Sequence, residues 1–254
     1  MRKKRIRILF ISLAVLLAGC SRGGNLRIQF SRVQLKRSYF RAIAQGGLPS
    51  LTRQGLASVA GICLNQAAGP YGDAAIAAMG VVQRVIMFGS SALIGFGQGF
   101  QPLCGFNYGA RLYSRVRKGF WFCFKTSVVF LVAVAVLMAA FAPQLVAFFR
   151  DDPEVVAIGA AALRYQCVTF FFLSWSVMSQ MMLQTIGRTG PATFLSMARQ
   201  GIFFIPLVWI LSSALGLVGI QITQAVADVF TMVCAIPIQL KALKELSVPD
   251  GTSL

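Results

Sequence analysis

The stretch that decides the fold is KGFWFCFKTSVVFLVAVAVLMAAF, residues 118–141. Its only charged side chains are Lys118 and Lys125. A helix of about 20 mainly apolar residues is long enough to cross the hydrocarbon core of a bilayer, so this stretch predicts a transmembrane helix. Segments of similar character recur at residues 48–68, 73–100, 155–184, 191–213 and 216–240. We therefore expect an all-α polytopic membrane helix bundle with six transmembrane helices.

The overall composition agrees with a membrane protein. Of the 254 residues, 57% are hydrophobic and only 12% are charged, whereas soluble domains carry about 25% charged residues. In a soluble protein, a net charge of +17 would suggest nucleic acid as a partner. Here most basic side chains lie at the ends of apolar segments and in short connections. We therefore expect the lipid bilayer as a partner and no nucleic acid.

The basic residues also predict the orientation of the segments. Cytoplasmic connections of membrane proteins are enriched in Lys and Arg, and three connections of the same parity fit this rule. They are residues 101–118, the connection around Arg188, and the exit of the last segment at Lys241 and Lys244. The alternate connections would face outward, and their acidic residues are Asp73, Asp151, Asp152 and Glu154.

The N-terminal residues 1–46 differ from the rest of the chain. The apolar run at residues 8–20 is too short to span a bilayer as a helix. Residues 22–41 mix basic and apolar side chains, which is typical of an amphipathic segment on an anionic membrane surface. Residues 1–20 could be a truncated helix, a misassigned start, or a lipoprotein signal ending in the box Leu17–Cys20. We divide the remainder into a six-helix region, residues 47–246, and a cytoplasmic tail, residues 247–254.

Missing residue types exclude several kinds of site. The sequence has no histidine, which removes Ser-His-Asp triads and HExxH zinc sites. It contains no GxxxxGK[ST] phosphate loop, and its six cysteines form no CxxC pair. We therefore expect no catalytic residue, no metal site and no cofactor, and we do not expect an enzyme.

Five groups of residues resemble one family of bacterial exporters. In chain order they are GLPSLTRQG (residues 47–55), LNQAAG with YGDAA (64–69 and 71–75), GQGFQP (97–102), GFNYGA (105–110) and RQGIFFIP (199–206). Together, and in this order, they are similar to the C-terminal lobe of multidrug and toxic compound extrusion (MATE) transporters. The resemblance covers about residues 26–246.

The resemblance implies a fold and a function. MATE transporters have twelve helices in two six-helix lobes around a central cavity, and this chain matches the second lobe only. The implied function is secondary active efflux of lipophilic cationic drugs in antiport with H⁺ or Na⁺, across the bacterial inner (cytoplasmic) membrane. A separate N-terminal lobe or a second copy would complete the transporter. The alternatives are a non-transporting membrane fragment or assembly partner, and a flippase-like carrier of lipid-linked substrates.

Asp228 is the sharpest candidate site residue, because an ionisable group inside a membrane helix is costly and needs a reason to be there. It lies about eleven residues into its segment, and the resemblance places it where the twelfth helix carries an acid. It could bind the coupling ion, or it could form a buried charge pair with Arg84 or Arg199. We expect Arg53, which is nearer a segment end, to extend its charge towards the membrane surface.

Uncharged amide side chains indicate a polar cavity. Amides supply both hydrogen-bond donors and acceptors without a net charge. They could line a water-accessible substrate path, or they could only join helices to one another. The candidate cavity-lining residues are Gln54, Asn65, Gln66, Gln83, Gln180, Gln184 and Gln224.

Overall fold

The computed structural model describes residues 37–251, except for the side chains of residues 37–39, 41–46 and 49. The chain divides into two compact units between Ile43 and Ala44, and the helix bundle is the second unit. The short apolar run at residues 8–20, with its lipoprotein alternative, and residues 22–36 of the basic segment 22–41 lie outside the described residues.

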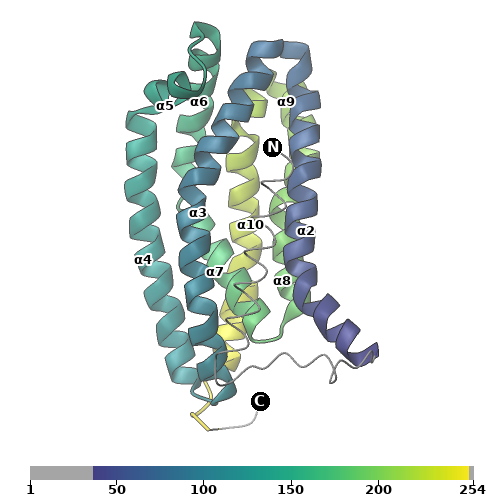
Figure 1. Ribbon diagram of the computed structural model, residues 1–254, viewed down its shortest axis with the longest axis vertical. Coiled ribbons are helices and arrows are strands. Elements are labelled where there is room, and N and C mark those ends of the chain that lie inside the picture. Colours follow the sequence, from purple (N-terminus) through teal and green to yellow (C-terminus); the bar gives the residue numbers. More distant parts are fainter. Residues whose placement is uncertain (1–36, 252–254) are drawn as a thin grey trace, which may run out of the picture. The chain divides into compact units, whose positions relative to one another are not determined.

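The described part of the chain consists of helices and contains no strand, as predicted. Its long helices run roughly alongside one another (Figure 1). The helical elements are α2 (Arg37–Ala68), η2 (Gly69–Tyr71), α3 (Asp73–Gly109), α4 (Tyr113–Ala140), α5 (Ala142–Phe149), α6 (Pro153–Thr169), α7 (Phe172–Thr185), α8 (Thr189–Met197), the π-helical turn η3 (Ala198–Ile202), α9 (Phe204–Leu215) and α10 (Leu217–Glu245).

Most helix ends fall where the turn residues of the sequence place them. Gly72, Gly187 and Gly216 have positive φ angles of 91°, 81° and 61°, a conformation that glycine adopts without steric cost. The start of α6 is capped by Asp152, whose side chain accepts a hydrogen bond from the backbone N–H of Glu154 at 3.0 Å. Local turn chemistry therefore sets these boundaries.

Four parts of the bundle are long and apolar enough to cross a membrane, and a bent helix pair makes a fifth if it counts as one span. Among the described residues these are α3, α4, the combined α8–α9 span Thr189–Leu215, α10, and the pair α6 and α7 if the pair counts as one span. The segment 48–68 lies in α2. We expected it to be a sixth span, but its mean hydropathy is lower than that of the helices that qualify as spans. The polar residues inside α2, among them Arg53 and Asn65, lower its mean hydropathy.

Three other boundaries differ from the sequence prediction. The expected connection 101–118 is largely helical, because α3 continues through Pro102 to Gly109. The expected helix 155–184 is instead two helices, α6 and α7, that meet at an angle of 59°. The connection between α4 and α6 contains the short helix α5. This helix lies at the opposite end of the bundle from the end of α10 (Figure 1).

The three basic connections lie at the same end of the bundle, as predicted. The side chain of Asp250, which follows α10, accepts hydrogen bonds from the backbone N–H of Ser114 at 2.9 Å and from its hydroxyl. Arg188, between α7 and α8, forms an ion pair with Glu245 at the end of α10. Together with the hydrogen bond from the Gly251 backbone N–H to the Arg111 carbonyl at 2.9 Å, these contacts join the α3–α4 connection, the α7–α8 connection and the C-terminal residues.

Close helix packing depends on small residues where α3 meets α7. A Cβ atom on Gly97 of α3 would lie only 2.3 Å from the Sδ of Met181 on α7. Met178 and Met182 on α7 are fully buried in the same core. The outer faces are apolar as well, and Phe88, Val129 and Val168 are each at least 70% exposed, which is expected for side chains that contact lipid.

Candidate functional site

A charged cluster inside the bundle is centred on Asp228 of α10. Asp228 is 6% exposed, and its Oδ1 accepts a hydrogen bond from the Nε of Arg199 at 2.7 Å. The same oxygen accepts a second bond from the Nε2 of Gln224 at 2.9 Å. Gln224 lies one helical turn before Asp228, where residues four apart face each other. A guanidinium and an amide therefore both hold this carboxylate.

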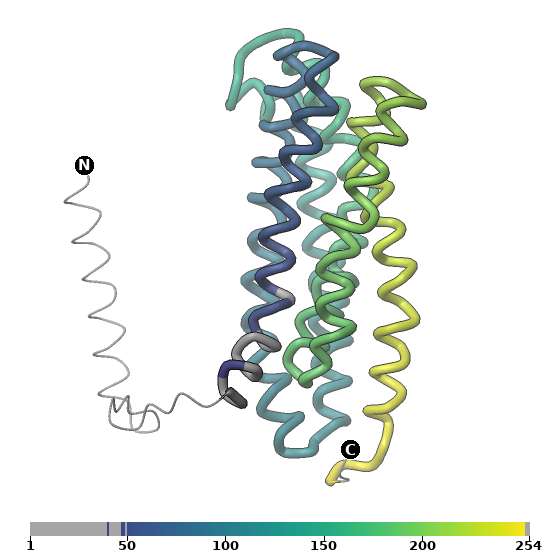
Figure 2. The backbone as a smooth tube through the Cα atoms, turned by 90° about the vertical axis from the view of Figure 1, so that its right-hand side faces the viewer, coloured from purple at the N-terminus to yellow at the C-terminus, as the bar shows by residue number. Residues whose placement is uncertain are grey.

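Arg199 reaches the cluster from the π-helical turn η3. Here the backbone N–H of Phe203 bonds to the carbonyl of Ala198, five residues earlier, at 3.0 Å. Such a turn interrupts the regular α-helix with one extra residue and is frequent at functional sites. The turn lies against α2, because a Cβ atom on Gly201 would come within 2.9 Å of the Leu56 side chain. Both views show the α8–α9 rod beside α2 (Figures 1 and 2).

A small polar cavity adjoins this turn, and Arg199 is part of its wall. The cavity has a volume of about 50 Å³, enough for a few water molecules or one small polar group. Its apolar wall includes Ile94, Leu173 and Val177. Its polar wall comes from α2, α3, α7, α8 and η3 and comprises Arg53, Ser90, Ser176, Gln180, Ser196, Arg199 and Gln200.

The structure pairs Asp228 with Arg199 and not with Arg84. Arg84 is exposed on α3 and has no ion partner within residues 37–251. Arg84 and Asp228 lie at similar depths along α3 and α10. However, Arg84 is on an exposed face of α3, whereas Asp228 is on a buried face of α10. Arg84 lies on the same exposed stripe of α3 as Met87 and Phe88, at the spacing of three and four residues that defines one helix face.

The predicted amide residues separate into two groups. Gln180 lines the cavity, Gln224 bonds to Asp228, and Gln184 is half-buried. The other four are exposed in this bundle and do not line the cavity: Gln54, Asn65, Gln66 and Gln83. The structure therefore brings two of the seven amides to the site.

Arg53 was assigned to the wrong environment by sequence reasoning. Its Nε is buried without a hydrogen-bond partner, and the residue lines the cavity instead of extending to a membrane surface. A signal was present in the sequence, because Arg53 continues the stripe of Leu56, Ala60 and Leu64 at helical spacing. Ala60 and Leu64 are buried. The three cavity serines, Ser90, Ser176 and Ser196, carry no comparable signal.

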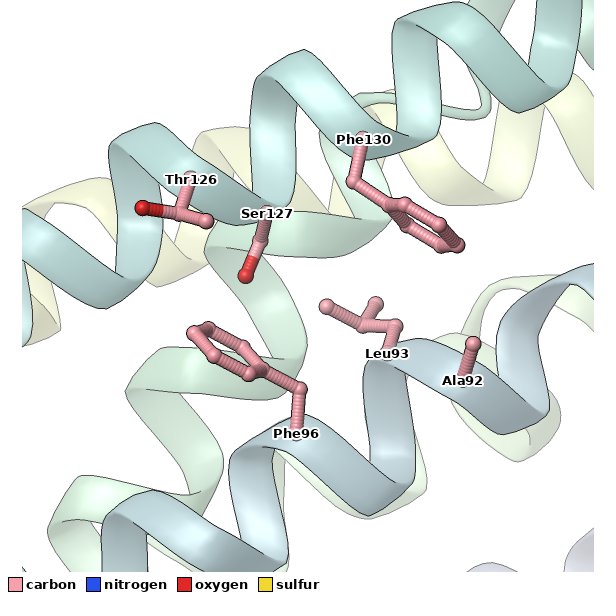
Figure 3. Close-up of a pocket in the computed structure, with 6 residues that line it drawn as sticks. All are labelled: Ala92, Leu93, Phe96, Thr126, Ser127 and Phe130. Atoms are coloured by element: carbon pink, nitrogen blue, oxygen red, sulfur yellow. The ribbon is translucent and has the colours of Figure 1, made fainter.

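A second cavity, larger and apolar, lies between α3 and α4 (Figure 3). It has a volume of about 240 Å³ and is lined by Ala92, Leu93, Phe96, Thr126, Ser127 and Phe130. Leu93 and Phe96 extend from α3 towards α4, with Phe96 near Ser127, and Phe130 extends from α4 (Figure 3). The Ser127 hydroxyl donates to the backbone carbonyl of Cys123 at 2.6 Å. No charged side chain lines this cavity, so it has no feature of an ion site.

The apolar outer faces, the membrane-length helices and the internal charge pair beside a polar cavity define a multi-pass membrane protein. Comparison with known proteins then gives its family. The MatE family profile matches residues 49–210, which is more than half of the chain, so the chain belongs to the MATE family.

Curated relatives are similar over part of their length. The multidrug export protein MepA of Staphylococcus haemolyticus (strain JCSC1435) is 26% identical over 202 residues, which cover 78% of this chain and 43% of that protein. MepA of Staphylococcus saprophyticus is 24% identical over 215 residues, or 85% of this chain and 47% of that protein. The chain thus spans less than half the length of these relatives.

Solved structures show the same fold over one half of a transporter. A multidrug resistance MATE family transporter of the MOP superfamily, in an outward-facing conformation, superposes with a TM-score of 0.81 at 22% identity. The match covers 94% of this chain and 53% of that one. The Vibrio cholerae MATE transporter VcmN in its bent form gives 0.76 at 21% identity, over 84% and 49%. This coverage agrees with the expectation of one lobe.

Proposed function

We propose that the chain forms one lobe of a secondary active multidrug exporter in the bacterial inner membrane. It would export lipophilic cationic compounds in antiport with H⁺ or Na⁺. Membership of the MATE family and the likeness to proteins named multidrug export protein MepA support this proposal. Because the chain spans less than half of those relatives, the second lobe would come from a separate N-terminal lobe or from a second copy.

The observation that carries the coupling part of the proposal is the environment of Asp228. An antiporter needs a group that the coupling ion and the substrate neutralise in turn. The Asp228 carboxylate is buried, is held by Arg199 at 2.7 Å and is connected through Arg199 to the cavity. A proton or Na⁺ at this carboxylate would weaken its attraction for Arg199 and change the charge that the cavity presents. A cationic substrate would compete for the same carboxylate.

The test is drug efflux from cells. We would express the chain in a drug-hypersensitive bacterial strain, alone and with a co-expressed N-terminal lobe of MepA, and measure ethidium efflux from energised cells. We expect efflux when both lobes are present. Asp228→Asn should abolish it at an unchanged protein level in the membrane, because the amide cannot exchange a proton at neutral pH. Asp151→Asn, in a connection at a bundle end, is the matched control and should leave efflux intact.

Two results would contradict the proposal. Absence of efflux in every combination, with the chain present in the inner-membrane fraction, would indicate a non-transporting fragment or an assembly partner. Full efflux by the Asp228→Asn variant would show that the residue only joins helices. Repeating the assay with a Na⁺ gradient or a proton gradient alone would identify the coupling ion.

A further inference from the structure

Arg53 is a charged side chain at mid-helix without a partner. It lies sixteen residues after the first residue of α2 and fifteen before the last, which is about 22–24 Å from either end at 1.5 Å per residue. Its Nε–H is buried and donates to no partner within the described residues. Because the guanidinium group stays protonated in proteins, this position carries a permanent positive charge on the cavity wall.

None of the chain's seven acidic residues is available to balance this charge. Asp228 is already paired with Arg199, Glu245 with Arg188, and the side chain of Asp250 is bonded to Ser114. The remaining four lie in connections or in the first turn of a helix, and they are Asp73, Asp151, Asp152 and Glu154. With Arg53 and Arg199 on the cavity wall and Asp228 beside it, the local charge is +1.

The cavity wall also offers unused neutral donors. Ser176 and Gln180 lie one turn apart on α7 and both line the cavity, as does Gln200 of the π-helical turn. The side chains of these three residues make no hydrogen bond within residues 37–251. In contrast, Ser90 and Ser196 already donate to backbone carbonyls of their own helices. Free donors on α2, α7 and η3 therefore surround a space of about 50 Å³.

A positive charge with several free donors fits an anionic group. Arginine binds a carboxylate or phosphate through two parallel hydrogen bonds, and amide and hydroxyl donors can satisfy the remaining oxygen lone pairs. The cavity is too small for a whole drug molecule but has room for such a group. A cation in this cavity would meet the like charges of Arg53 and Arg199 and would reach a carboxylate only by displacing Arg199 from Asp228.

We infer that this cavity binds an anionic group, a carboxylate or phosphate, of the transported compound, with Arg53 as its main ligand. The inference rests on the proposed export function and narrows its substrate class. Compounds that combine a lipophilic cationic body with an acidic group would bind better than their neutralised analogues. Gln180, Ser176 and Gln200 would complete the contacts to the anionic oxygens.

The test uses a pair of dyes that differ in one charged group. Rhodamine B carries a free carboxylate, and in its ethyl ester that carboxylate is blocked, whereas the cationic ring system is the same. We would measure the binding of both to the purified full chain in neutral detergent by fluorescence polarisation. We expect the Kd for rhodamine B to be at least tenfold lower than that for the ester. Arg53→Gln should remove this preference, because the carboxylate of rhodamine B then loses its main ligand.

Matched variants separate this effect from misfolding. Arg84→Gln removes an exposed arginine of α3 and should keep the preference. Arg53→Lys keeps the charge but not the two-pronged geometry, so we expect a preference of intermediate size. Phosphatidylglycerol is added in a further arm. If it displaces rhodamine B from the wild-type chain and not from Arg53→Gln, a lipid phosphate is a second source of the anionic group.

Several outcomes would overturn the inference. One is equal binding of the two dyes, and another is a preference that persists in Arg53→Gln. In both cases dye binding and ethidium efflux can remain, so the export proposal would stand. Loss of the preference on co-expression of an N-terminal lobe would show that an acidic residue of that lobe neutralises Arg53. Failure of both dyes to bind also rejects the anion site, and ethidium efflux then decides on export separately.

Discussion

Asp228 is the one acidic side chain of the chain that lies away from helix ends, connections and the C-terminal residues. A buried ion pair contributes little net stability, because the cost of removing both charges from water offsets their attraction. Removing only one partner is costly, because the other charge is then buried without a counter-ion. The two partners differ in exposure, because the side chain of Asp228 is 7% exposed and that of Arg199 is 23% exposed. Loss of the arginine should therefore be worse than loss of the carboxylate.

This asymmetry leads to a stability prediction. Arg199→Gln leaves a buried carboxylate without its counter-ion, and we expect it to lower the free energy of unfolding by about 3–5 kcal/mol. Asp228→Asn should cost less, because Arg199 can turn towards the cavity. The double variant, with two amides that can bond to each other, should be more stable than Arg199→Gln alone. Thermal unfolding of the purified variants ranks their stabilities. If the stability losses of the two single variants simply add in the double variant, the prediction is wrong.

The carboxylate of Asp250 gives a pH-dependent prediction outside the membrane-spanning helices. Its pKa is lowered from 3.8, chiefly by the hydrogen bond from the Ser114 hydroxyl and then by that from the Ser114 backbone. A lowered pKa in the folded state means that these contacts stabilise the fold above the normal pKa and are lost as the pH falls through the lowered value. The C-terminal residues should therefore stay bound at pH 7 and be released only in acid.

Tail release can be followed with a fluorophore on Ser247→Cys in a variant whose native cysteines are replaced. Its anisotropy should stay high near neutral pH and fall only in acid, below the ordinary carboxyl pKa of 3.8. With Asp250→Asn in addition, the anisotropy should be low at every pH, because the amide holds the Ser114 donors less strongly. Asp151→Asn provides the control. An acid transition that survives in Asp250→Asn would assign the release to another group.

At the scale of elements, hydropathy and turn residues predicted most of the helices. Apolar length identified α3, α4 and α10, and glycines such as Gly72 and Gly216 marked their ends. Three features could not be read in this way. The break between α6 and α7 carries neither proline nor glycine, and the π-helical turn at Ala198–Ile202 depends on one extra backbone residue. The apolar segment 73–100 was expected to end before Pro102, but α3 continues through this residue, as helices in membrane proteins can when neighbours satisfy the freed carbonyl.

Only part of the candidate site was predicted, because the sequence shows where charges occur but not which helix faces meet. Asp228 and Arg199 were found because charges inside apolar segments are conspicuous. The choice between Arg84 and Arg199 as the partner needed the helix faces, which depth alone does not give. Arg53 was misassigned because α2 begins at Arg37, well before the apolar part of the segment, so the residue is at mid-helix instead of near an end.

The low hydropathy of α2 predicts that this helix inserts poorly on its own. An arginine at the centre of a membrane helix costs about 2.5–3.5 kcal/mol on insertion scales, and Arg53 is at the centre of α2. In a glycosylation reporter for membrane insertion, residues 44–68 should insert in a minority of molecules, whereas residues 113–140 of α4 should insert almost completely. Arg53→Leu should raise the inserted fraction of α2 at least twofold. Efficient insertion of the unchanged α2 would refute this account.

At the scale of the whole molecule, the contacts at one bundle end constrain the topology. Asp250 bonds to Ser114, and Arg188 pairs with Glu245, so three connections must face the same side of the membrane. Their excess of Lys and Arg predicts the cytoplasmic side. Helix α5 and the acidic residues near the start of α6 lie at the other end and should face outward.

Cysteine labelling in intact cells tests this topology directly. In a variant without native cysteines, we would place single cysteines at Arg111→Cys and Ser247→Cys for one end, and at Asp151→Cys for the other. A membrane-impermeant maleimide should label Asp151→Cys in intact cells and the first two only after the membrane is opened. Because exchange of cations across a bilayer requires a lobe with a fixed orientation, labelling of position 111 and position 247 from opposite sides would contradict the fold and the export proposal together. Labelling of positions 111 and 247 but not of position 151 in intact cells would mean that the bundle is inserted in the reverse sense, and the cavity beside Asp228 would then face the two compartments in the opposite order.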